Sequence, residues 1–332
     1  LLHSTLHQLC NAKIPCTPSN WTHRCILLTY VLIMINRSLI RLKIVQLLYA
    51  FSQNEGKDPE TAYKELDFSL EKTQDLYHYL LSTLLELRKL AATRDNVRLA
   101  RERRTGIASE NASADALFAA NRCIEKLGAN QEMMDFLENK KQEWSEEPAF
   151  IKNLYEEILD SDDFKTYAQQ KEHSFQDDKE LVLKIYRRSI VDNDKASEIL
   201  EDHSLYWNDD KDTVDSFILK TIKKLKEDTP DEAPLLPFFL KDEDRNFAHQ
   251  LFRAAITRAT ELQEMIAAQC KNWDFGRLAL MDVMILQTAL AEILTFDDIP
   301  LNVSFNEYIE IAKVYSTPQS PSFVNATLDS IA

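Results

Sequence analysis

Residues 278–293 read LALMDVMILQTALAEI, and apolar side chains recur in this stretch every three or four residues. The recurring positions are Leu278, Met281, Ile285, Ala289 and Ile293. This spacing predicts an amphipathic helix, and it recurs over residues 247–266, 305–315 and 323–331. Four closely joined helices of this kind bury their apolar faces only against one another. Residues 244–332 are therefore predicted to form a compact helical bundle without a catalytic site.

The composition favours helices along the whole chain. Of 332 residues, 45% are apolar and only four are glycine. Hairpin-rich folds and phosphate-binding loops need several residues that accept a positive φ, which is the usual role of glycine. We therefore expect an all-α fold. The sequence has no glycine-rich cofactor loop, nucleophile elbow or His-Glu-x-x-His helix, so it predicts neither a cofactor nor catalysis.

Prolines and capping residues predict where the C-terminal helices begin and end. Asp298-Ile299-Pro300 ends the helix that precedes it, and Ser304 with Glu307 matches a capping box that opens the next helix. Prolines cluster over residues 230–240, where we expect a domain joint. The C-terminal helical domain is then expected to cover residues 241–332.

The N-terminal half is also predicted to be helical. Residues 35–51 are apolar around almost the whole helical circumference, which indicates a central, buried helix. Gly56-Lys57 interrupts it, and Asp58-Pro59 supplies an N-cap and a first-turn proline for a long helix that runs towards Leu90. We expect these helices to belong to an enlarged N-terminal region over residues 34–240.

The first 33 residues are predicted to be an upstream segment with little structure, because Met34 stands just before the first clean helical pattern. The apolar run over residues 25–35 is too short to cross a bilayer, so no membrane anchor is expected. The cysteines and histidines near this end lack the close pairing of a metal site. Five cysteines in so long a chain indicate a reducing compartment, the cytoplasm.

The formal net charge is −15, and the first acidic residue is Glu55. A broadly acidic surface repels phosphate backbones, so a nucleic acid would need a local basic patch or a basic protein partner. Aspartates over residues 209–215 resemble a calcium loop but lack its central glycine and final glutamate. We interpret them as a solvated turn.

The densest basic cluster of the chain falls on one predicted helix. Its arginines are candidates for further phosphate contacts. The alternative interpretation is a solvated helix face whose charge is balanced by Glu86, Asp95 and Glu102. Its members are Arg94, Arg98, Arg101, Arg103 and Arg104.

Three strings in the C-terminal bundle are more specific than helix packing requires. They are Trp273-Asp274-Phe275-Gly276-Arg277-Leu278 with Met281-Asp282, then Asp298-Ile299-Pro300 leading into Asn306-Glu307, and finally Phe323-Val324-Asn325. Their order and spacing resemble the NusB family of bacterial transcription antitermination factors. Near the other end, Arg37-Ser38-Leu39-Ile40-Arg41, followed by Val45-Gln46 and Leu48-Tyr49-Ala50, looks like that family's first helix. The middle of the chain then looks like an enlargement.

This resemblance implies an all-helical fold of two small packed bundles and a role without catalysis. Proteins of this family pair with NusE, a ribosomal protein of the small subunit. The pair binds the single-stranded boxA element of nascent ribosomal RNA transcripts and helps RNA polymerase resist termination. The resemblance implies RNA contacts for six residues, which are Arg37, Arg41, Lys43, Gln46, Tyr49 and Asn325.

Asp298 and Glu307 are the residues that the resemblance implies for contact with NusE, because an acidic side chain pairs with a basic ribosomal protein. The alternative for Asp298 is a turn residue that ends a helix. The alternative for the Phe323-Val324-Asn325 string is packing of the last helix, with Asn325 bonded to backbone.

Two other functions remain open at this point. One is an acidic protein-binding scaffold in which the enlarged middle has replaced RNA binding. The other is the RNA-docking domain of a ribosomal RNA methyltransferase, although the sequence shows neither a cofactor turn nor a nucleophilic cysteine motif. Oligomeric state is also open, including a homodimer.

Overall fold

Helices make up all the regular secondary structure in the part of the chain that the structure describes. The computed structural model describes residues 37–53, 58–106, 113–139, 144–207, 209–235, 242–269 and 275–331. No strand occurs in these ranges, which confirms the predicted all-α fold. The predicted upstream segment, residues 1–33, lies outside them.

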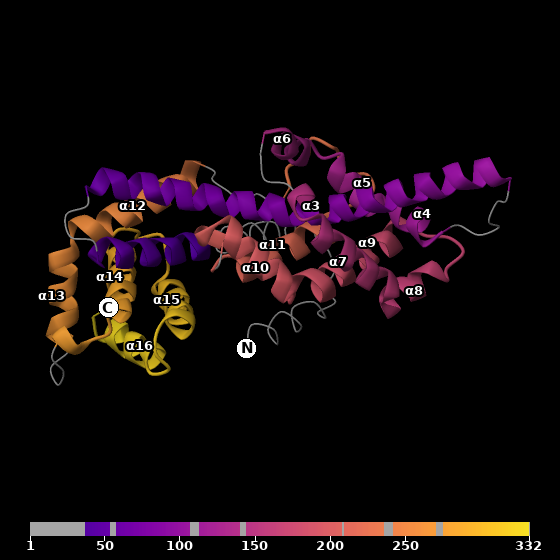
Figure 1. The fold of residues 1–332 in the computed structure, drawn as a ribbon. Helices are drawn as coiled ribbons and strands as arrows, with labels where there is room; N and C mark the ends of the chain where they lie inside the picture. Colours follow the sequence, from indigo (N-terminus) through magenta and orange to yellow (C-terminus); the bar gives the residue numbers. More distant parts are fainter. Residues whose placement is uncertain are drawn as a thin grey trace, which may run out of the picture. The chain divides into compact units, whose positions relative to one another are not determined.

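The chain divides into two compact units, each described here by itself (Figure 1). Unit 1 comprises the sequence up to Lys57 together with residues 242–332, and unit 2 comprises residues 58–241. Unit 1 is therefore discontinuous in sequence. Its described part contains a helix over residues 37–53 and the five α-helices α12 to α16.

Helix α14 (Leu280–Ile293) is the centre of unit 1. It packs against four other helices of the unit, which are α12 (Asp242–Thr257), α13 (Ala259–Gln269), α15 (Leu301–Tyr315) and α16 (Ser320–Ile331). Every residue from Asp282 to Glu292 is buried, so this helix is enclosed on all sides rather than on one face as its sequence predicts. The polar residues within it must then find partners inside the protein.

Two predicted helix boundaries in unit 1 are wrong. The stretch over residues 247–266 forms two helices, because the chain turns at Arg258 between α12 and α13. Helix α15 begins at Leu301, with Pro300 at the N-cap position, so Ser304 and Glu307 do not form a capping box. Their side chains instead face the interior of unit 1, as described below.

Unit 2 is built on α3 (Pro59–Thr105), a helix of 47 residues that spans roughly 70 Å at 1.5 Å per residue. Asp58 is its N-cap and Pro59 its first residue, as predicted, although the Asp58 side chain makes no capping bond. Gly106 ends the helix at φ 70°, a left-handed conformation that glycine adopts without steric cost.

The other α-helices of unit 2 are α4 (Ala114–Ala119), α5 (Arg122–Gly128), α6 (Gln131–Asn139), α7 (Pro148–Asp160), α8 (Asp162–Ala168), α9 (Phe175–Ile185), α10 (Asp194–His203) and α11 (Lys211–Lys224). Helices α4, α5, α6, α7 and α11 pack on α3, whereas α8 packs on α7 and α9 (Figure 1). The indole N–H of Trp144 donates to the Tyr79 carbonyl of α3 at 2.9 Å, and that of Trp207 donates to the Lys72 carbonyl at 2.8 Å.

Two of the four aspartates interpreted as a solvated turn, Asp210 and Asp215, are buried in unit 2, which corrects that prediction for them, whereas Asp209 and Asp212 are exposed. Asp210 accepts a hydrogen bond of 2.5 Å from the Thr73 hydroxyl on α3. Asp215 accepts from Lys211 Nζ at 2.8 Å and from the Tyr186 hydroxyl at 2.6 Å. Burial raises the pKa of the Asp215 carboxyl, while its two donors oppose that shift.

None of the described helices has the length and apolar content needed to cross a membrane.

Candidate RNA and partner interface

Arg41 fixes the helix over residues 37–53 to α14. Its Nε donates to Glu292 Oε2 at 2.6 Å and its Nη2 to Oε1 at 2.9 Å, a bidentate pair from positions 251 residues apart. The Arg41 side chain is 1% exposed and that of Glu292 is 0% exposed. A planar guanidinium matches a carboxylate in this geometry, so the pair fixes the orientation as well as the position of the helix.

Helix α15 supplies two further donors to the same carboxylate. The Ser304 hydroxyl donates to Glu292 Oε1 at 2.6 Å, and the Tyr308 hydroxyl lies 3.1 Å from Oε2. Glu292 thus joins three helices of unit 1 through four hydrogen bonds. Burial raises the pKa of the Tyr308 phenol, with the negative charge of Glu292 adding to the effect, so this hydroxyl remains a donor.

Glu307 lies at the edge of this buried cluster. Its Oε2 is 3.5 Å from Arg41 Nη1, and Ser38 donates a hydrogen bond to it from the first helix. Burial raises the pKa of the Glu307 carboxyl, while the Ser38 bond and the charge of Arg41 oppose that shift. The predicted partner residue is therefore bound mainly within unit 1, with 20% of its side chain exposed.

Arg37 is held one turn before Arg41. Its guanidinium carbon lies 4.7 Å from the centre of the Phe247 ring, and its Nε is 3.7 Å from Asp244 Oδ1. Both partners belong to α12, and 21% of the Arg37 side chain is exposed. A cation above an aromatic face is stabilised by the electrons of the ring, so Arg37 is also largely a structural residue here.

Two of the first-helix cations for which the resemblance implies RNA contact are buried. Arg41 is enclosed with its counterion, and Lys43 is 3% exposed. Gln46 and Tyr49 are half-buried, so parts of both side chains reach the surface. Arg37, Gln46 and Tyr49 are thus the members of the predicted set on this helix whose side chains are partly exposed.

Asp298 and Asn325 are both exposed, in a turn after α14 and on α16 respectively. Beside Asn325, Val324 is fully buried, so the apolar part of this string packs the last helix. Asp282, from another string of the family pattern, has a structural role. It accepts from the Ser316 hydroxyl at 2.6 Å and from the Ser320 hydroxyl at 2.9 Å, which fixes the start of α16 against α14.

The arginines of α3 fall into two groups. Arg94 Nη2 lies 3.1 Å from Glu156 and its guanidinium lies over the Tyr155 ring at 5.1 Å. Arg98 binds Asp95 at 2.7 Å and Glu102 at 2.5 Å. The pairs of Arg98 agree with the alternative interpretation, whereas Arg94 pairs with Glu156, which that interpretation does not name, and Glu86 pairs with Lys89. Arg101, Arg103 and Arg104 are exposed and have no carboxylate partner among the described residues.

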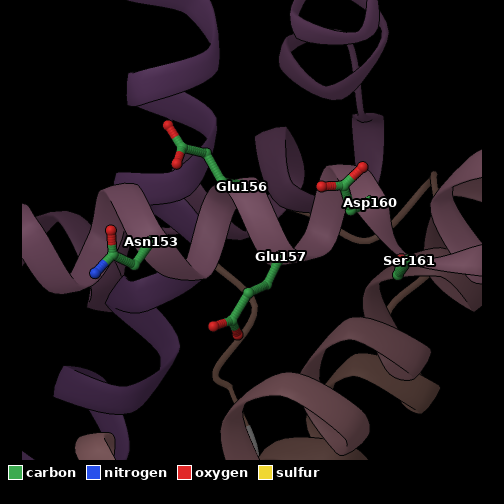
Figure 2. Close-up of a pocket in the computed structure, with 5 residues that line it drawn as sticks. All are labelled: Asn153, Glu156, Glu157, Asp160 and Ser161. Carbon is green, nitrogen blue, oxygen red and sulfur yellow. The ribbon is translucent and has the colours of Figure 1, made fainter.

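Unit 2 also has an acidic surface hollow of about 490 Å³ along α7. Figure 2 shows Asn153, Glu156, Glu157 and Asp160 following this helix, with Ser161 at its end. Glu156 is the partner of Arg94, whereas the Asp160 side chain is 90% exposed. Such a surface repels phosphate and favours basic ligands.

Sequence reasoning missed Glu292, the residue on which the polar cluster depends. The available signal was a lone glutamate near the end of the otherwise apolar string ALAEIL at residues 289–294. An ionised side chain is rarely buried unless it is paired, so a glutamate in an enclosed helix calls for a buried cation. Among the described residues, no group of three or more His, Cys, Asp or Glu side chains is arranged to hold a metal ion.

Comparison with known proteins agrees with this architecture. The sequence model described as "NusB family" matches residues 176–332. Three similar proteins are each called "Transcription antitermination protein NusB". The one from Geobacter sulfurreducens is 42% identical over 106 residues, 30% of this chain and 77% of the relative. The one from Salinibacter ruber is 44% identical over 93 residues, which are 27% of this chain and 58% of the relative. The one from Geobacter sp. strain M21 is 36% identical over 123 residues, which are 37% of this chain and 83% of the relative.

The fold and the buried cluster define an all-helical protein in which a distant first helix completes a C-terminal bundle. Because the match covers more than two thirds of the length of two of these relatives, the chain belongs to the NusB family. The family match ends with the chain and begins in α9 of unit 2, so it does not include the first helix. That helix is assigned to unit 1 by the structure.

Proposed function

We propose that this protein is a transcription antitermination factor that binds boxA-type single-stranded RNA together with NusE. The observation that carries the proposal is the 42% identity to an antitermination protein of which 77% is covered. In this proposal the pair joins the antitermination complex of RNA polymerase on nascent ribosomal RNA transcripts. The role is that of an adaptor, without a catalytic step or cofactor.

The RNA surface in this proposal is the outward part of the first helix. Tyr49 can stack on an unpaired base, Gln46 can bond to a base edge, and Arg37 can reach a phosphate. Arg41 acts as a positioning residue, because its pair with Glu292 fixes how the helix presents these side chains. Asn325 and Asp298 are exposed and supply the proposed contacts to RNA and to the basic partner respectively.

A three-component binding assay tests this function. The protein is titrated with boxA RNA, with NusE, and with both, at two salt concentrations. We expect NusE to tighten RNA binding, and we expect Tyr49→Ala to weaken the complex about 10-fold through the lost stacking. The control is Gln53→Ala, since Gln53 is exposed at the end of the same helix. Equal RNA binding with and without NusE, or an unchanged affinity of the Tyr49 variant, would reject the proposed interface.

A second candidate function is a protein-binding scaffold without RNA affinity. Two observations favour it: the first-helix arginines are held inside unit 1, and unit 2 carries most of the negative charge. Positions 58–241 contain 40 acidic and 27 basic residues, which gives −13 of the total −15. In the same assay this function predicts binding of NusE with no gain from RNA. Light scattering of the protein alone tests whether a homodimer forms.

A further inference from the structure

The last turns of α3 extend beyond the helices that pack on it. Ala91 is the last buried residue of α3, and among bonds between described residues Asp95 is the last to bond outside the helix, through the Ser113 hydroxyl at 2.9 Å. Residues 96–106, which we call the α3 tip, are mostly exposed. The tip ends at Gly106, after which the helix cannot continue in the same conformation.

The tip differs in charge from the rest of unit 2. Most described arginines of this unit have a carboxylate within ion-pair distance, and they are Arg88, Arg94, Arg98, Arg122 and Arg188. Arg101, Arg103 and Arg104 have none among the described residues, and all three are exposed. Three guanidinium groups within four residues, without a carboxylate partner in the described part of the chain, therefore occur in a unit whose formal charge is −13.

The chemistry of the tip suits phosphate rather than bases. A guanidinium group presents several donors in a plane and binds phosphate oxygens in pairs. Bases of a single strand are usually held by aromatic stacking, and residues 96–106 include no aromatic side chain. Basic residues are also stabilised at a helix C-terminus by the helix dipole, but that effect requires neither three of them nor their full exposure.

We propose that the α3 tip binds the phosphate backbone of single-stranded RNA that flanks the boxA element. The proposal rests on the proposed function, because it presumes that unit 1 with NusE holds boxA itself. The acidic surface of unit 2 repels RNA, so the tip is the place where the flanking strand touches this unit. The contact is independent of sequence and strongly dependent on salt, since no base is read.

The test compares two triple variants of the full chain in the presence of NusE. The first is Arg101→Gln, Arg103→Gln and Arg104→Gln at the tip. The second, a matched control, is Lys171→Gln, Arg187→Gln and Lys223→Gln, which removes the same charge from three exposed and separate positions of unit 2. Each is titrated with boxA RNA alone and with boxA RNA carrying uridine flanks on both sides, from 50 to 200 mM salt.

We expect the tip variant to bind the flanked RNA about 10-fold more weakly at 100 mM salt and to bind boxA alone as the unmodified protein does. The salt slope for the flanked RNA should fall by about 2, because each phosphate contact with a single strand contributes about 0.7. The control variant should keep its slope.

An unchanged affinity and slope for the tip variant, or an equal loss in the control, would overturn the proposal while leaving boxA binding in place. If the unmodified protein with NusE binds neither RNA, the proposed function fails and the tip contact fails with it. Preference of the tip for an acidic peptide over flanked RNA, measured by competition, would also overturn it.

Discussion

Replacing Glu292 should detach the first helix from unit 1. In Glu292→Ala, the Arg41 guanidinium loses two hydrogen bonds and its buried counterion, and the hydroxyls of Ser304 and Tyr308 lose their acceptor. Removing one partner of a buried ion pair costs about 3–5 kcal/mol, because the other charge remains buried and uncompensated. Whole domains are stable by only about 5–15 kcal/mol, so the loss is a large fraction of the stability of unit 1.

Hydrogen exchange measured by mass spectrometry gives the most direct assay, because it reports on each helix separately. Protection of residues 37–53 should fall by more than about 100-fold, whereas α3 in unit 2 should keep its protection. The matched control is Glu310→Gln. Glu310 is exposed and, among the described residues, forms an ion pair with Lys313 alone, at 2.5 Å on the same helix; such surface pairs contribute less than about 1 kcal/mol.

A double variant separates loss of the pair from loss of volume. In Arg41→Met with Glu292→Met, both charges are gone and the site is filled by apolar side chains, so much of the lost stability should be recovered. Recovery should stay incomplete, because the buried hydroxyls of Ser304 and Tyr308 still lack their acceptor. The reasoning is refuted if Glu292→Ala leaves the first helix fully protected. It is also refuted if the double variant is no more stable than Glu292→Ala.

Three further predictions concern other parts of the molecule. Burial raises the pKa of Glu307, so the folded protein holds this proton more tightly than the unfolded chain. The resulting contribution to stability is present below the ordinary pKa of 4.5 and is lost as pH rises through the folded value. In Glu307→Gln, the urea concentration at half-unfolding should therefore depend less on pH above 4.5. Lys211→Met should destabilise unit 2 by about 3 kcal/mol, because it leaves Asp215 buried without its cation. Thermal melting of the double variant Lys211→Met with Asp215→Leu checks that cause, since removing both charges should restore part of the lost stability. Gly106→Ala should cost about 1 kcal/mol at φ 70° while Gly106→Asn costs less, and equal melting temperatures for the two would count against a backbone origin.

Periodicity predicted the helices of unit 1 and the long helix α3, because apolar spacing and proline positions are local signals, but it did not predict α4 to α11 individually. It identified α14 and placed the start of α3 at Asp58-Pro59, but it could not show that α14 is enclosed on every side. The number of neighbours that surround a helix depends on segments far away in the chain. A run as apolar as residues 283–291 was the one local sign of that enclosure.

The candidate site was harder to predict, because a charged residue has the same identity whether it faces water or a counterion. Arg41 fits an RNA-contact pattern in sequence, and only the position of Glu292, 251 residues later, shows that it is an internal ion pair. Ser304 and Glu307 likewise have capping-box spacing, yet their partners lie on other helices. Long-range pairing of polar groups leaves no periodic trace in the sequence.

The discontinuity of unit 1 has a consequence for synthesis on the ribosome. Residues 37–53 leave the ribosome before unit 2, and Glu292 is added only 251 residues after Arg41. At about 5–20 residues per second, the first helix waits roughly 10–50 s for its partners, with its apolar surface uncovered and its arginine unpaired. Unit 2 can fold during that interval, because its residues are continuous in the chain. Chaperone binding to nascent chains should therefore be strongest at lengths between the end of unit 2 and the emergence of α14.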